Sequence, residues 1–281
     1  MNPPITAAGS GPATASGPAD VPLDDRATFA DAVHSEWTKL RTLRSSTYTL
    51  LTAVVLGVAM AFFFTSGTGE GYAGSSASEK EEWDPTLTSL LGATLFAQLA
   101  IGALGVLSSS GEYATGMIRT SLTVVPRRGR LMAAKAVVIG GVALVAGELI
   151  GFAGFLISQP VLKGMDVPYA TLGQPHVLRA VIGTGLYLSM VALLGLALGL
   201  LVRSTAGAIV LLVVATVIIP YMVGPMLPPL ARGAWPVMSG MMIMSTNIEL
   251  GIPAWAAFGV MAAGVGAVLA AAYVLFRRRD V

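Results

Sequence analysis

The sequence predicts an all-α, polytopic membrane protein with six transmembrane helices, preceded by an amphipathic helix at the membrane interface. Hydrophobic residues make up 54% of the 281 residues, and charged residues only 11%. A soluble domain carries about 25% charged residues, so this chain is too apolar for a soluble fold. The apolar residues also gather in six runs, each long enough for the roughly 20 residues of a transmembrane helix.

The six predicted transmembrane helices lie near residues 47–65, 86–110, 133–157, 179–202, 204–228 and 254–276. Only the region of Arg203 and Ser204 separates the fourth helix from the fifth, which predicts a tight helical hairpin. Pro220 and Pro225 are expected to break or kink the fifth helix near its outer end, because proline removes a backbone donor.

Lysine and arginine residues fall mostly on one side of this topology. The other side holds only Lys80, Lys163, Arg179 and Arg232 of the 17 basic residues. Because basic residues accumulate in cytoplasmic loops, this asymmetry places both termini in the cytoplasm. The positive charge therefore indicates membrane topology, and we expect no nucleic-acid partner.

Two segments precede the first transmembrane helix. Residues 1–25 are rich in Pro, Gly, Ala and Ser, lack the pattern of a signal peptide, and are expected to form a disordered cytoplasmic tail. Residues 26–44 predict a helix with a capping box at Thr28 and Asp31. One face of this helix carries Phe29, Val33, Trp37 and Leu40, and the opposite surface carries Asp31, Glu36, Lys39 and Arg41.

We interpret the 26–44 segment as an amphipathic helix in the inner membrane interface, with Trp37 at headgroup depth. The alternative is an ordinary cytoplasmic helix that packs on protein. The interfacial interpretation is favoured because the helix runs directly into a membrane span.

Glu148 is the acidic residue expected deepest in the membrane, and Gln98 in the second span is a possible partner. An ionised group at that depth costs about 2.5–3.5 kcal/mol on insertion scales, so it should face other helices or a wet cavity. Glu148 could serve as a proton or substrate site. Alternatively, it is a protonated side chain hydrogen-bonded between helices.

Small and flexible residues mark two further features. Gly147 with Gly151, and Gly195 with Gly199, have the GxxxG spacing that lets helices approach closely, either within the chain or between two copies.

The outer segment 229–253 is rich in methionine. It is expected either to dip back into the membrane as short helices or to pack over the bundle as a loop.

The sequence lacks the residues of a catalytic or metal site. It has no cysteine, no HExxH zinc motif, no GxSxG nucleophile motif and no Walker A motif. We therefore expect a non-catalytic subunit with no metal and no cofactor of its own.

The connection between the second and third spans, residues 111–132, is unusual for a short loop. Ile118, Leu122 and Val125 are spaced i, i+4, i+7 and would form one apolar edge of a helix, which Pro126 should end. The neighbouring arginines could meet lipid phosphates or an acidic partner, or they could only enforce topology.

Together, the EWTKLRTLRS end of the first helix, the six spans and the connection GEYATGMIRTSLTVVPRRGRLMAAK resemble an ABC-2 type ABC transporter permease of the actinobacterial kind. The resemblance covers residues from about 30 to 281, so 26–281 is taken as one permease domain. Glu112, Gly116 and Arg119 match the family's pattern in the connection.

This resemblance implies a transmembrane subunit of an ATP-driven exporter in a bacterial plasma membrane. Two such subunits, expected here as a homodimer, would pair with two copies of a separate ATPase that binds ATP and Mg. The cytoplasmic coupling segment, residues 111–132, would contact that ATPase through Glu112, Tyr113, Gly116, Met117, Ile118, Arg119, Leu122 and Val125. The alternatives are a secondary transporter driven by protons through Glu148, and a structural or regulatory membrane protein without transport. The resemblance leaves the substrate open.

Overall fold

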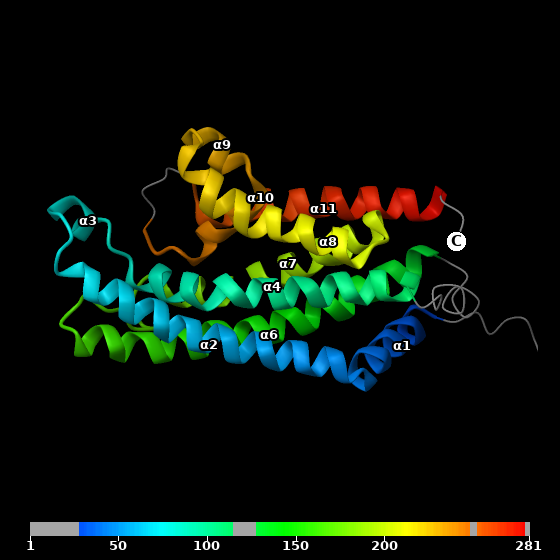
Figure 1. The fold of residues 1–281 in the computed structure, drawn as a ribbon, viewed down its shortest axis with the longest axis horizontal. Helices are drawn as coiled ribbons and strands as arrows, with labels where there is room; N and C mark the ends of the chain where they lie inside the picture. The colour runs from blue at the N-terminus through cyan, green and yellow to red at the C-terminus, as the bar shows by residue number, and fades with distance from the viewer. Residues whose placement is uncertain (1–27, 115–127, 248–251, 279–281) are drawn as a thin grey trace, which may run out of the picture.

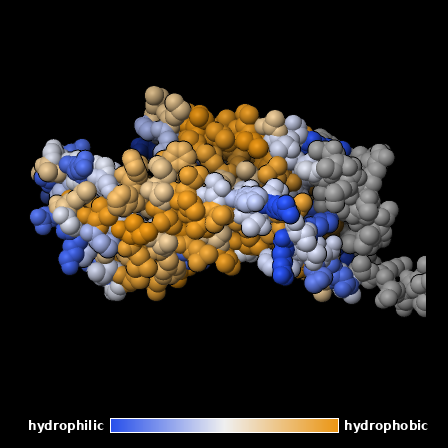
Figure 2. Space-filling model, turned by 60° about the horizontal axis from the view of Figure 1, so that its bottom comes forward, coloured by the Kyte–Doolittle hydropathy of each residue, from blue (hydrophilic) through white to orange (hydrophobic). Residues whose placement is uncertain are grey.

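The computed structural model describes residues 28–114, 128–247 and 252–278. All regular secondary structure in these ranges is helical, and six helical segments are long and apolar enough to cross a membrane. The predicted fold class is therefore confirmed. An apolar band covers the middle of the molecule, and polar residues gather at its two ends (Figure 2).

The spanning helices follow the predicted order but most are longer than predicted. They are α2 (Arg44–Tyr72), α4 (Pro85–Ala114), α6 (Arg128–Gly164), α7 (Val177–Val202), α8 (Thr205–Val213) with its continuations η1 (Val214–Val223) and η2 (Gly224–Met226), and α11 (Ala254–Arg278). The extra turns contain polar residues that hydropathy alone assigns to loops. In α2, for example, the hydroxyl groups of Ser66 and Thr68 donate to the carbonyls four residues earlier.

Helices α4 and α7 form the middle of the bundle, with α2 and α6 on one side and α8 and α11 on the other (Figure 1). Glycine makes the close contact between α4 and α7 possible: a side chain at Gly195 would collide with the Gly102 carbonyl. Gly147 and Gly151 similarly face Gly185 and Val181 of α7. Both GxxxG pairs are thus used for packing within the chain.

The fourth and fifth spans form a hairpin whose turn consists of Arg203 and Ser204. Arg203 has a left-handed backbone with φ of 55°, and the Ser204 side chain caps α8 by accepting from the Gly207 amide at 3.5 Å. Further along, the helix changes at Pro220. Residues Val214–Val223 adopt a π-helix that contains this proline, followed by the single 3-10 turn of η2.

Short helices fill the outer segment: α9 (Pro229–Ala234), α10 (Pro236–Met241) and η3 (Met242–Met244). Asp84, just before α4, holds the residues that follow η3: its carboxylate accepts hydrogen bonds from the Thr246 amide at 2.6 Å and the Ser245 hydroxyl at 3.1 Å. Arg179 of α7 donates to the carbonyls of Ile243 and Ser245. The segment is therefore held against α4 and α7. The remaining short helix, α3 (Ala77–Glu81), lies at the same end of the bundle (Figure 1).

Candidate functional site

One end of the bundle carries the parts from which a coupling surface would be built. Helix α1 (Phe29–Thr42), the last turn of α4, the first turn of α6 and the last turn of α11 all lie at this end (Figure 1). The predicted coupling residues Gly116, Met117, Ile118, Arg119, Leu122 and Val125 lie outside the described residues, in the connection from α4 to α6. Glu112 and Tyr113 belong to the last turn of α4, but their side chains are outside the description.

Helix α1 begins with the capping box that the sequence predicts. The Asp31 amide donates to the Thr28 hydroxyl oxygen at 3.3 Å, and the Thr28 amide donates to the Asp31 carboxylate at 2.8 Å. Hydrogen bonds from the Thr28 side chain and backbone lower the pKa of Asp31, which stays exposed. The carboxylate therefore remains ionised at the positive end of the helix dipole.

A buried ion pair joins α1 to the rest of the bundle. The Lys135 ammonium of α6 donates to the Glu36 carboxylate at 2.7 Å and to the Ser108 carbonyl of α4 at 3.2 Å. The Lys39 ammonium reaches the other carboxylate oxygen of Glu36 at 2.8 Å. Because the Glu36 and Lys135 side chains are only 7% and 4% exposed, this contact fixes α1 to α4 and α6 beside the coupling segment.

This arrangement corrects the assignment of Glu36 to the polar face of the amphipathic helix. Glu36 points into the bundle because Lys135 provides its counter-charge there, and Ala32 packs beside it on Leu131 and Ala134. Phe29 and Trp37 stay 44% and 45% exposed. Val33 and Leu40 pack partly on the bundle, so the predicted apolar face is divided between protein contact and an exposed edge.

The predicted pair of membrane-embedded polar residues does not meet in a hydrogen bond among the described residues. Gln98 is fully buried, accepts from the Tyr187 hydroxyl at 2.7 Å and donates to the Thr216 carbonyl at 3.3 Å. Glu148 lies instead against Gly185 of α7, and its buried Oε2 has no hydrogen-bond partner in the described part of the chain. The sequence did not predict Tyr187 as the partner of Gln98, because this tyrosine lies within a continuous apolar run.

The π-helix is supported by side chains from two other elements. Pro220 has no amide hydrogen, so it cannot donate to the carbonyls of Ala215 and Thr216, five and four residues earlier. The Trp235 indole N–H donates to the Ala215 carbonyl at 3.2 Å, and the Gln98 amide donates to Thr216. In a π-helix the proline removes the donor of the Ala215 carbonyl, which is hydrogen-bonded to Trp235 instead, and the next carbonyl, of Thr216, accepts from Gln98.

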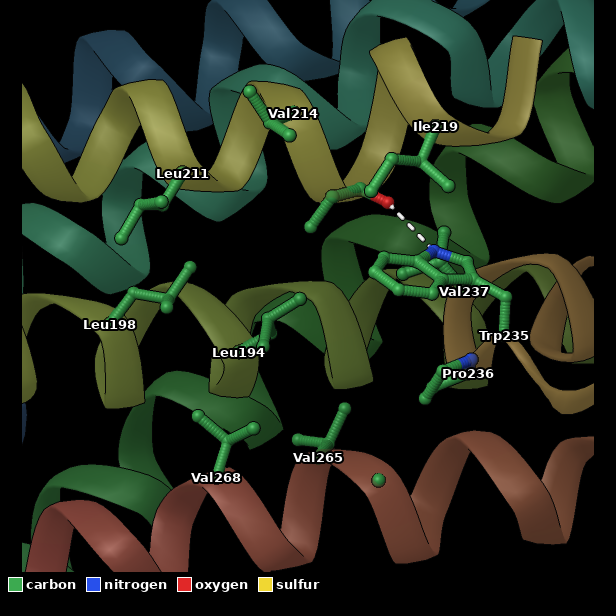
Figure 3. A pocket seen from close by; sticks show the side chains of 12 residues that line it. Leu194, Leu198, Leu211, Val214, Ile219, Trp235, Pro236, Val237, Val265 and Val268 are labelled. Carbon is green, nitrogen blue, oxygen red and sulfur yellow. Dashed lines mark hydrogen bonds between the residues drawn. The ribbon is translucent and has the colours of Figure 1, made fainter. Parts of the chain in front are cut away.

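An apolar cavity of about 340 Å³ lies beside this π-helix (Figure 3). Its walls come from α7, α8 with η1, α10 and α11. The lining residues are Leu194, Leu198, Leu211, Val214, Ala215, Ile219, Trp235, Pro236, Val237, Gly264, Val265 and Val268. None of these side chains is charged, and the Trp235 N–H is already used by Ala215.

The comparison with protein families gives a match over residues 32–219, to the family described as ABC-2 family transporter protein. This stretch is about two thirds of the chain and runs from α1 into the π-helix. The chain belongs to the ABC-2 transporter family. The comparison with curated proteins gives no match.

Membership identifies this ABC-2 protein as an ABC transporter permease, a multi-pass membrane subunit of a kind that is typically non-catalytic. The matched stretch includes both residues of the Glu36–Lys135 pair and the whole coupling segment. The family also implies an ATPase partner for the permease. A signal for the ion pair was present in the sequence, since Lys135 lies inside the predicted span 133–157 and a lysine there needs a partner.

Proposed function

We propose that this permease is the transmembrane subunit of an ATP-driven exporter, that it works as a homodimer, and that each copy is driven by one separate ATPase subunit. ATP and Mg would be bound by the ATPase alone. The basic residues gathered at the α1 end support a cytoplasmic location for this end, with both termini on the cytoplasmic side of a bacterial plasma membrane.

The observation that carries the proposal is the Glu36–Lys135 contact beside the coupling segment. The connection 115–127 leaves α4 at Ala114 and enters α6 at Arg128, and Lys135 lies two turns into α6. Lys135 holds Glu36 of α1 and the Ser108 carbonyl of α4 together. A push from an ATPase on the segment would therefore move α1, α4 and α6 as a connected group, which supports ATP-driven rearrangement of the bundle.

Reconstitution tests this function. Liposomes that contain the permease, with and without its co-purified ATPase and ATP, should transport substrate only in the complete system. Ile118→Glu and Arg119→Glu should leave the permease folded but uncouple ATP hydrolysis from transport, because they place an acid on the proposed contact surface. Transport by the permease alone, or unchanged coupling in both variants, would contradict the proposal.

A proton-driven secondary transporter is the second candidate, favoured by one observation: the buried Glu148 Oε2 has no hydrogen-bond partner in the described part of the chain. Glu148→Gln separates the two mechanisms because it keeps the shape and removes the titratable group. Abolished transport would support the proton-driven mechanism, and a small effect would support the ATP-driven one.

A further inference from the structure

The cavity beside the π-helix has the properties of a site for a hydrocarbon chain. Water needs two to four polar partners to occupy a cavity, and this one offers aliphatic side chains and an indole N–H that is already bonded. Its volume of about 340 Å³ is at the lower end of the range for ligand pockets, about 300–1,000 Å³. The cavity therefore suits one apolar chain better than a whole amphiphile.

The position of the cavity identifies the source of that chain. Val265 lies 11 residues into α11, about 16 Å along a helix of this geometry, which places the cavity near the middle of the spans. Two wall residues, Leu211 and Val214, are 46% and 36% exposed, so the cavity lies at the surface of the bundle. The exposed side chains of Val210 and Met222 continue the same apolar surface, which faces the lipid chains at this depth.

Specific contacts build the cavity, so it is more than loose packing. Trp235, the N-cap residue of α10, reaches the π-helix through its hydrogen bond to the Ala215 carbonyl, an acceptor that Pro220 leaves available (Figure 3). On the opposite wall, a side chain at Gly264 would collide with Pro236, so glycine lets α10 settle on α11. These contacts join the π-helix, α10 and α11 around the cavity.

We propose that the cavity binds one acyl chain of a bilayer lipid, which inserts between the π-helix, α7 and α11 and contacts Trp235. The proposal does not depend on the direction of transport or on the partner ATPase. It names a lipid site on the permease itself.

Bromine-labelled lipid tests the proposal, because bromine quenches tryptophan fluorescence only at short range. In one protein Trp37, Trp83 and Trp255 are replaced by phenylalanine, which leaves Trp235 as the reporter. In a second, Trp255 is the remaining tryptophan; it is 57% exposed on α11 and reports general lipid contact. Both are reconstituted in nanodiscs of phosphatidylcholine with or without bromine on the acyl chains.

Brominated lipid should quench Trp235, and Val268→Phe should reduce that quenching at least about twofold, because the larger ring fills a pocket of this size. Leu198→Phe, on a different wall, provides the second filling variant. Val274→Phe is the matched control, since Val274 is exposed on α11 and does not line the cavity. Quenching of Trp255 should be the same in all variants.

Two results would overturn the proposal. Absence of Trp235 quenching in the unfilled protein would mean that the cavity is closed to lipid, for instance by a second copy of the chain. Quenching that neither filling variant changes would mean that lipid touches Trp235 from outside the cavity. Helical circular dichroism and elution volume show which variants are folded. If one of the two filling variants does not fold, the other is sufficient for the test.

Discussion

At the scale of single residues, the most informative contacts are those in which a polar group is buried with a specific partner. Glu36 and Lys135 come from segments 99 residues apart, and Gln98 and Tyr187 from segments 89 residues apart. Each pair connects helices that apolar packing alone would leave free to slide. Polar contacts of this kind set the register of the bundle.

The Glu36–Lys135 pair should have a measurable effect on stability. Glu36→Gln removes the carboxylate charge that lies 2.7 Å from the buried Lys135 ammonium, and it is expected to lower the free energy of unfolding by about 3 kcal/mol. Lys39→Gln is the matched control, because it removes the other cation beside Glu36. The Lys39 side chain is 27% exposed, so this change should cost less than about 1 kcal/mol. Equal effects in thermal or denaturant unfolding would show that the buried contact has no special role.

The cap of α1 should depend on pH in a defined direction. Hydrogen bonds from Thr28 lower the folded-state pKa of Asp31 below its usual value of 3.8, so the unfolded helix binds the proton more tightly. The cap is therefore complete above pH 3.8 and is lost as the pH falls through the lowered pKa. Hydrogen exchange of the first turn of α1 should increase there, and Asp31→Asn should remove this pH dependence. A wild-type helix that opens with rising pH would contradict it.

At the scale of elements, the fifth span departs most from regular helix, at a proline whose neighbouring carbonyls are bonded by side chains from other segments. Pro220 leaves the carbonyls of Ala215 and Thr216 without its amide as a donor, and Trp235 and Gln98 supply donors from α10 and α4. The sequence predicts an interruption at this proline. It does not predict a π-helix, because that outcome depends on donors that arrive from distant segments.

A double-mutant cycle measures this dependence. Trp235→Phe removes the indole donor and should destabilise the protein by about 1 kcal/mol, as expected for one hydrogen bond. Pro220→Ala restores an amide that can donate to the Ala215 carbonyl. In that background the loss from Trp235→Phe should be nearly zero, which gives a coupling of about 1 kcal/mol between the two positions. Additive effects would mean that the tryptophan and the proline act independently.

At the scale of the whole molecule, hydropathy predicts the number and order of the spans because each run of apolar residues is local information. The helix ends are longer than predicted, since polar residues such as Ser66 and Thr68 are accommodated in the helix by donating their hydroxyl groups to the carbonyls four residues earlier. The environment of each polar side chain depends on packing. Lys135 could be recognised as a lysine inside a span, but its pairing with Glu36 can be seen only in the folded bundle. The same holds for Glu148, whose Oε2 has no hydrogen-bond partner among the described residues.

For the candidate site too, the sequence predicts the segment but not the packing around it. The resemblance in the connection between α4 and α6, and the family match over residues 32–219, both lead to an ABC transporter permease, and this family implies an ATPase partner. The described structure adds the frame around that connection: α1, α4 and α6 are joined at its base by Lys135. Motion at the connection would reach three helices at once, which is what a coupling element requires.

Cross-linking at Leu122 tests the central claim most directly, because the chain contains no cysteine and a single introduced thiol has no background. Leu122→Cys, labelled with a photoreactive maleimide in native membranes, should cross-link to an ABC-type ATPase that carries a Walker A motif. A cysteine at Ser75, on the opposite end of the bundle, provides the control and should give no such product. Absence of an ATPase adduct at Leu122, or equal adducts at both positions, would contradict ATPase docking at the coupling segment.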